Sequence, residues 1–181
     1  LGLARLRARG QLVELRAAEL RFTDEETHRF LEGLAGRSVS DENSRVLADH
    51  TEGWAAGLQL AAIGLQGSDN PEQFVRLFTG SNRYVLDYLV EEVLDQQPED
   101  TNEFLLKSSI LEELSAELCD HVLQRTDSKE MLERLERTNL FIEPMDDSRR
   151  WYRYHKLFAD LLRQRMQRRF GDEQAKLNKR A

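Results

Sequence analysis

The sequence predicts a mainly α-helical protein, with a small helical bundle followed by a winged-helix domain that carries a short β-hairpin. Only 3 prolines and 10 glycines interrupt the 181 residues. Through most of the chain apolar residues recur every three or four positions, which is typical of amphipathic helices. Between residues 141 and 155 the spacing changes to the alternation typical of strands, and the helical spacing then returns.

The composition is that of a folded, soluble domain rather than a fibrous or disordered chain. Hydrophobic residues make up 40% and charged residues 33%, and the net charge is −7. No apolar run approaches the roughly 20 residues that span a bilayer. The single cysteine, Cys119, cannot form an internal disulfide and is expected to be a buried small hydrophobe in a reducing compartment. We therefore expect a cytoplasmic location and no membrane partner.

Residues 1–22 are expected to lead in from an upstream domain, because Leu12, Val13 and Leu15 suggest a strand or extended segment. The first residue is not methionine, which fits a piece of a longer protein as well as a processed chain. Residues 23–80 are expected to form the helical bundle. Thr23 and Glu26 have the spacing of a capping box at a helix start. The other start and stop signals are Gly36, Ser40, Gly53 and Pro71.

Residues 81–170 are expected to form the winged-helix domain, and 171–181 a tail or linker. The run from 81 to 97 predicts a long helix in which Asp87, Glu91 and Asp95 lie on a solvated face. Three helices then follow Pro98, and a hairpin with a turn at 146–148 precedes a closing helix, which is the order of a winged helix. The candidate strand residues are Phe141, Met145, Trp151 and Tyr154.

Catalytic signatures are absent from the sequence. No phosphate-cradling GxxxxGK[ST], no GxGxxG, no GxSxG and no HExxH occurs. The 4 histidines are scattered, no second ligand pair stands at a zinc-like spacing from Cys119 and His121, and no two carboxylates pair for acid–base work. We therefore expect a non-catalytic chain that binds no metal.

A stand-alone winged-helix DNA-binding module and a protein-interaction module remain alternative interpretations. The recognition-like helix reads SKEMLERLERTN, and its three basic residues are matched by three glutamates. A helix that reads a DNA groove normally keeps a positive surplus, because the phosphates supply most of the affinity. The only concentrated basic stretch, 163–169, spreads its arginines around a helix, which favours a solvated face.

Several long stretches together resemble one family, the MalT-like large ATP-dependent LuxR-type transcriptional regulators of the STAND class of signalling ATPases. The similarity extends from about residue 1 to about residue 169. The stretches that carry it are LRFTDEETHRFL, TEGWAAGLQLAA, YVLDYLVEEVLDQQP, FLLKSSILEELSAELCD, ERTNLFIEPMDD and WYRYHKLFADLLRQR.

The resemblance implies that the chain is part of a longer regulator and acts in signal transduction. The bundle would be the helical lid of an upstream nucleotide-binding core, whose end is similar to residues 1–22. Superhelical sensor repeats and a separate C-terminal helix-turn-helix would follow, and DNA would be bound only there. ATP or ADP would be bound in the full-length protein and not by this chain alone. Self-association on activation is a further implied partner interaction.

The resemblance also implies four nucleotide-binding residues in the full-length context. The stretch GWAAGLQL is similar to the lid segment that lies against adenine in related proteins, so Gly53 and Ala55 are candidates, although many relatives have proline where Ala55 stands. His155 matches a histidine that contacts the β-phosphate of ADP in relatives, and Lys156 adds positive charge beside it. The residues alone favour His155 as a helix cap that packs in the core, and only the resemblance makes a phosphate contact an equal alternative. For Gly53 and Ala55, tight helix packing stands as the equal alternative to an adenine contact.

Overall fold

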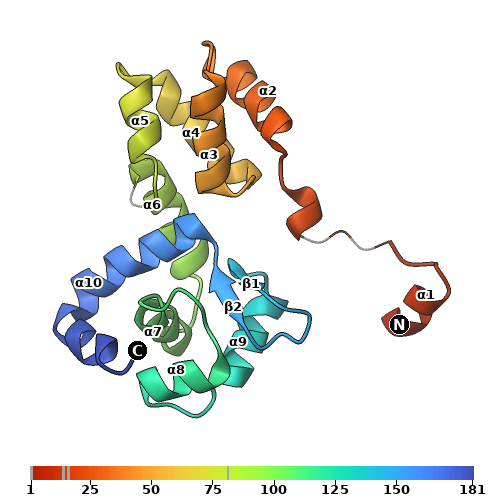
Figure 1. The fold of residues 1–181 in the computed structure, drawn as a ribbon, viewed down its shortest axis with the longest axis vertical. Coiled ribbons are helices and arrows are strands. Elements are labelled where there is room, and N and C mark those ends of the chain that lie inside the picture. The colour runs from red at the N-terminus through yellow and green to blue at the C-terminus, as the bar shows by residue number, and fades with distance from the viewer. Residues whose placement is uncertain (1, 14, 16, 81) are drawn as a thin grey trace.

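The computed structural model describes residues 2–13, 15, 17–80 and 82–181. Two lobes lie one above the other in Figure 1, and an arm at the N-terminal side ends in the short helix α1 (Leu3–Ala8). The 3₁₀ helix η1 (Ala17–Leu20) leads from this arm into the first lobe. The described residues between these helices form neither helix nor strand, so the strand considered for Leu12, Val13 and Leu15 is not found there.

The helical lobe consists of α2 (Asp24–Ala35), α3 (Asp41–Thr51), α4 (Ala55–Gln66) and α5 (Pro71–Leu77). The predicted start signals are confirmed. Thr23 and Glu26 form the full capping box, the Ser40 hydroxyl accepts a hydrogen bond from the Asn43 amide, and Pro71 opens α5. Gly36 ends α2 in the left-handed conformation, with φ 63°. Local sequence signals thus mark where α2, α3 and α5 begin and where α2 ends.

The two lobes are joined along the chain by α6 (Arg83–Leu89), which continues into the π-helix η2 (Val90–Leu94). The helix predicted between residues 81 and 97 is therefore confirmed, and its last part has π-helical rather than α-helical geometry. Asp87, Glu91 and Asp95 are exposed, as expected for a solvated face. Tyr84 and Tyr88 lie at the spacing of the apolar residues of this helix but are half-exposed, because only one side of α6 packs against the lobes.

The winged-helix lobe has the predicted order of helices and strands, which confirms the fold class. Its elements are α7 (Glu99–Ser108), α8 (Ala116–Leu123), α9 (Ser128–Arg137), β1 (Ile142–Pro144), β2 (Tyr152–Tyr154) and α10 (Lys156–Asn178). The strands pair antiparallel with Glu143 opposite Arg153. An isolated bridge from Leu114 to Tyr152 adds the stretch after α7 to this small sheet.

Helix α10 extends beyond the predicted closing helix, through residues 171–178. Phe170 has a non-helical backbone, with φ −129° and ψ 29°, and kinks the helix there. Beyond the kink, Leu177 is buried and Arg180 donates a hydrogen bond to the Val122 carbonyl. The last turns of α10 therefore pack back on the winged-helix lobe.

Buried apolar side chains of both lobes form one contiguous core. Its largest fully buried members are Phe78 after α5, Phe104 on α7 and Phe158 on α10. At Gly80 the backbone comes close to the first turn of α10, since a Cβ atom there would lie 1.9 Å from the Leu157 carbonyl oxygen. The connection out of the helical lobe is thus pressed against the first turn of α10. Among the described residues, no helix has both the length and the apolar character needed to cross a membrane.

Candidate functional site at the junction of the lobes

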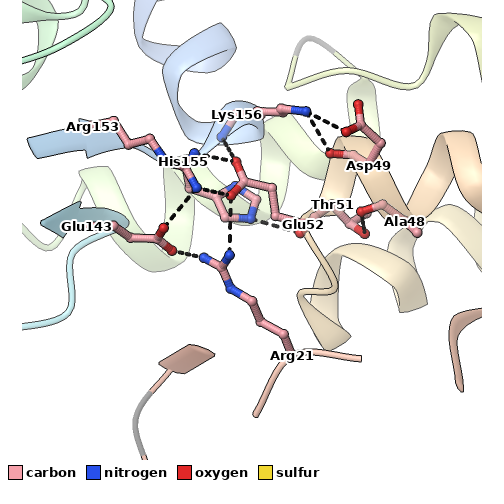
Figure 2. A network of polar contacts seen from close by, with 9 residues as sticks. All are labelled: Arg21, Ala48, Asp49, Thr51, Glu52, Glu143, Arg153, His155 and Lys156. Carbon is pink, nitrogen blue, oxygen red and sulfur yellow. Dashed lines mark hydrogen bonds and ion pairs between the residues drawn. The ribbon is translucent and has the colours of Figure 1, made fainter. Parts of the chain in front are cut away.

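The candidate site lies where the C-terminal end of α3 meets the N-terminal end of α10. Figure 2 shows the polar side chains that converge there from four parts of the chain: Arg21 before α2, Glu52 after α3, Glu143 on β1, and 153–156 at the end of β2 and start of α10. We call Arg21, Glu52, Glu143 and Arg153 the interlobe clasp.

Glu52 is at the centre of the clasp. Its two carboxylate oxygens accept hydrogen bonds from the two Nη atoms of Arg153, at 2.9 and 2.7 Å, and one of them also accepts from the Lys156 amide at 2.9 Å. The side chain is 8% exposed. Burial raises the pKa of Glu52, but the hydrogen bonds from Arg153 and Lys156 outweigh it and bring the pKa to about 2. Glu52 is therefore a carboxylate at neutral pH.

The second cation of the clasp, Arg21, pairs with both acids. One of its Nη atoms lies 3.5 Å from Glu52, and the other forms an ion pair with Glu143. Glu143 in turn accepts a hydrogen bond of 2.9 Å from Arg153. Two arginines and two glutamates thus alternate, and their formal charges cancel.

His155 occupies the N-cap position of α10 and is 5% exposed. Its Nε2 lies 2.8 Å from the Thr51 carbonyl oxygen, and because a carbonyl only accepts, Nε2 carries the proton. The other nitrogen, Nδ1, is buried without a hydrogen-bond partner among the described residues. Burial lowers the pKa of His155 more than Glu52 and the Thr51 carbonyl raise it. The ring is therefore a neutral donor to the helical lobe.

Aromatic rings hold the imidazole in place. Trp54 of the helical lobe and Phe141 of the winged-helix lobe both meet it edge-on, with ring centroids 6.0 and 5.8 Å away. The two aromatic rings also contact each other, with centroids 5.0 Å apart. These contacts fix the direction of the imidazole at the point where the lobes meet.

The other three candidate nucleotide-binding residues lie around the same junction. Lys156 is exposed, and its Nζ pairs with Asp49 on α3 at 2.7 Å. Gly53 is buried with φ 69°, and a Cβ atom there would lie 2.5 Å from the Phe22 carbonyl oxygen. Ala55 opens α4 and is exposed. The structure therefore brings His155, Lys156 and Gly53 to one junction, with Ala55 two residues beyond Gly53.

Sequence reasoning missed Glu52, Arg153 and Arg21. One local signal was available, since a Glu-Gly pair that ends a helix puts a glutamate next to the residue expected to take the left-handed conformation. The distance of 101 residues between Glu52 and Arg153 left no signal in the sequence itself. Cys119 is buried as predicted, and burial raises the pKa of its thiol to about 12. No group of three potential metal ligands occurs among the described residues.

Comparison with known proteins relates the chain to one group of regulators. Residues 90–174 match the MalT winged helix domain. Over 169 residues, or 92% of the chain, it is 40% identical to the HTH-type transcriptional regulator MalT of Klebsiella pneumoniae and 39% identical to that of Cronobacter sakazakii. The MalT protein of Serratia proteamaculans is 38% identical over the same length.

These similarities extend across both lobes and not only the winged helix. The chain spans about a fifth of the relatives, since 169 residues cover 19% of their length. The winged-helix match begins at the first residue of η2 and ends in the last turns of α10, so it covers the helices and strands of the winged-helix lobe. Over the part of these proteins that it spans, the chain belongs to the MalT-like transcriptional regulators, and residues 90–174 are its MalT winged helix domain.

Proposed function

We propose that the chain is the non-catalytic lid and winged-helix segment of an ATP-dependent LuxR-type regulator, and that it closes on ADP bound to an upstream core. The similarity to MalT over both lobes supports the regulator assignment. The observation that carries the nucleotide proposal is the position of His155, which caps α10 and donates to the helical lobe. A ligand that contacts this ring therefore contacts both lobes at their junction.

The residues at the junction fit a phosphate group under one condition. In the neutral ring the only N–H donates to Thr51, so a phosphate oxygen can be bound only after Nδ1 takes up a proton. Nδ1 is buried and unpaired, so the protonated form gains a partner when an anion arrives. Bound ADP would supply negative charge that favours this protonation. We therefore propose that nucleotide binding and proton uptake at His155 are linked.

Lys156, Gly53 and Ala55 have supporting roles in the proposal. Lys156 is held by Asp49 but is exposed, so its ammonium group can reorient toward an anion at the mouth of the junction. Gly53 binds the backbone of Phe22, with an amide-to-carbonyl distance of 2.9 Å, and so fixes the chain that enters from upstream. Ala55, at the first turn of α4, has no side chain that would obstruct a flat ring.

Regulation in this proposal depends on differential affinity. ADP must bind the closed arrangement of the lobes better than any open one, because a ligand with equal affinity for both shifts neither. His155 supplies such a difference, since its ring is directed by Thr51 and Trp54 only while the lobes are together. Opening of the lobes would then allow self-association and promoter binding through other domains of the regulator.

Calorimetry on the regulator, extended to its nucleotide-binding core, tests this function. ADP is titrated at pH 7.5 in two buffers with different ionisation enthalpies, into the wild type and the H155A and H28A variants. We expect proton uptake and tight binding for the wild type and H28A, and for H155A at least tenfold weaker binding without proton uptake. Equal affinity and equal proton uptake in H155A would reject the role of His155.

The alternative of direct DNA reading by α9 is not favoured by its contacts. Glu136 accepts a hydrogen bond from the Tyr152 hydroxyl and pairs with Arg149 on the wing, so the acidic residue is fixed on the side of the wing. Arg134 is directed inward to Thr101 and Met131 rather than outward. These contacts reduce the positive charge that α9 and the wing could present to phosphates.

A further inference from the structure

Glu52 adopts a backbone conformation that favours glycine. It caps the C-terminal end of α3 with φ 48° and ψ 37°, in the left-handed region. A Cβ atom comes too close to the backbone in this conformation, so glycine is the residue most often found at such caps. Here the glycine, Gly53, stands one residue later, and the cap itself is a glutamate. A glutamate in this conformation costs stability locally, and its side-chain contacts must offset that cost.

Those contacts all lie outside the helical lobe's own helices. Arg153 and the Lys156 amide belong to the winged-helix lobe, and Arg21 to the segment before α2. The pair with Arg153 is bidentate, which is among the strongest side-chain arrangements in proteins. The Lys156 amide is at the N-terminal end of α10, where the helix dipole favours a carboxylate. The stabilisation from the contacts between the carboxylate and the winged-helix lobe therefore offsets the strain in the backbone of Glu52.

Arg21 extends the same contact to the chain that enters the helical lobe. It pairs with Glu52 of this lobe and with Glu143 of the winged-helix lobe. The following residue, Phe22, donates its amide hydrogen to the Gly53 carbonyl oxygen at 2.9 Å. A displacement of residues 21 and 22 would therefore remove a cation from both glutamates at once, and each carboxylate, mostly shielded from water, would lose a partner.

We propose that Glu52 holds the helical lobe on the winged-helix lobe, and that Arg21 makes this contact depend on the position of the segment that precedes α2. The interlobe clasp is then the means by which a preceding domain controls the angle between the lobes. The inference does not require nucleotide binding, so it can be tested on the 181-residue chain alone.

The first test asks whether replacing Glu52 by glycine lowers or raises the stability of the chain. E52G removes the carboxylate but relieves the left-handed backbone. Q124G is the matched control, because Gln124 caps α8 with φ 58° and, among the described residues, its side chain donates only to the nearby His121 carbonyl. In urea unfolding we expect E52G to lower the folding equilibrium constant at least tenfold, and Q124G to leave it unchanged or raise it. If E52G is as stable as the wild type or more so, Glu52 is only a helix cap and the proposal is wrong.

The second test measures the distance between the lobes. Spin labels on cysteines that replace Glu72 of α5 and Glu130 of α9 report it by double electron–electron resonance, and the buried Cys119 remains unlabelled. We expect one narrow distance distribution in the wild type and broader ones in E52Q and R21Q. The double variant should be no broader than E52Q. E99Q, which removes the exposed pair with Arg169 inside one lobe, serves as the control.

The E52Q variant keeps the proposal testable if E52G does not fold, because glutamine has the same shape and leaves the backbone strain in place. A folded E52Q protein with the wild-type distance distribution would overturn the role of Glu52. A distribution in R21Q that is identical to the wild type would overturn the dependence on the preceding segment.

Discussion

Glu52 and Arg153 are 101 residues apart in the chain and join through two parallel hydrogen bonds of 2.9 and 2.7 Å. One residue ends α3 and the other lies on β2, so this pair connects the helical lobe to the winged-helix lobe. The same carboxylate receives the amide of Lys156 at the start of α10. Three secondary structure elements from two lobes therefore meet at a single carboxylate.

The first prediction concerns acid. The pKa of Glu52 is about 2 in the folded chain against 4.5 as the ordinary value, so the folded state binds the proton less well than the unfolded state. The contribution of the ionised Glu52 side chain to the free energy of unfolding is complete above pH 4.5 and is lost as the pH falls toward 2. It is on the order of 1–2 kcal/mol after a discount for solvent screening. Urea unfolding should show the wild type losing its advantage over E52Q between pH 5 and 2.5. A difference that does not change with pH would contradict the charged role.

The second prediction concerns His155 between pH 7.5 and 5. Burial lowers its pKa from 6.5 in the folded chain, so the neutral ring stabilises the fold above pH 6.5. As the pH falls below 6.5 the unfolded chain takes up the proton first, and this contribution declines. The free energy of unfolding in urea should therefore fall more steeply with decreasing pH for the wild type than for H155Q. H121Q, at an exposed position of α8, should follow the wild type, and parallel curves for H155Q would contradict the burial effect.

The third prediction compares two glycines. G80A should destabilise the chain by about 1–3 kcal/mol, because the new methyl group would overlap the Leu157 carbonyl and push α10 away. G33A should instead stabilise it by about 0.5–1 kcal/mol, since Gly33 lies inside α2 with no atom within 4 Å of the added carbon. Thermal and urea unfolding measure both. Equal effects would contradict the close approach at Gly80.

The fourth prediction concerns the last turns of α10. Leu177 is 3% exposed, so L177A should cost about 2–4 kcal/mol of unfolding free energy, the usual range for a buried leucine. L77A, at a leucine that is 64% exposed, should change the free energy by no more than about 0.5 kcal/mol. Urea unfolding of both variants checks this. An L177A protein as stable as L77A would show that residues 171–178 do not pack on the lobe.

Local signals made the fold predictable from the sequence. The capping box at Thr23 and Glu26, the cap at Ser40 and the proline at the start of α5 each act within four residues, so the helix starts could be read directly. The hairpin was predicted from alternation, although Phe141, Met145 and Trp151 flank its strands rather than lie in them. The isolated bridge between Leu114 and Tyr152, which adds a third segment to the small sheet, joins residues far apart in the chain and gave no local signal.

The candidate site was predictable only in part. His155 could be named because it stands directly before a helix, but its partner is the backbone carbonyl of Thr51, and no residue type signals such an acceptor. The clasp could not be found, because Arg21, Glu52 and Arg153 are ordinary charged residues until the fold brings them together. These long-range ion pairs depend on the packing of α3 against α10, and no fixed interval in the sequence indicates them.

A double-mutant cycle on Glu52 and Arg153 tests most directly whether this pair joins the lobes. The unfolding free energies of the wild type, E52Q, R153M and the double variant are measured in urea at pH 7. The exposed pair of Glu99 and Arg169 serves as the reference cycle. A coupling energy of about 1–3 kcal/mol for the first pair, against less than about 0.5 kcal/mol for the reference, is the predicted result. A coupling energy for Glu52 and Arg153 no larger than that of the reference pair would contradict the account.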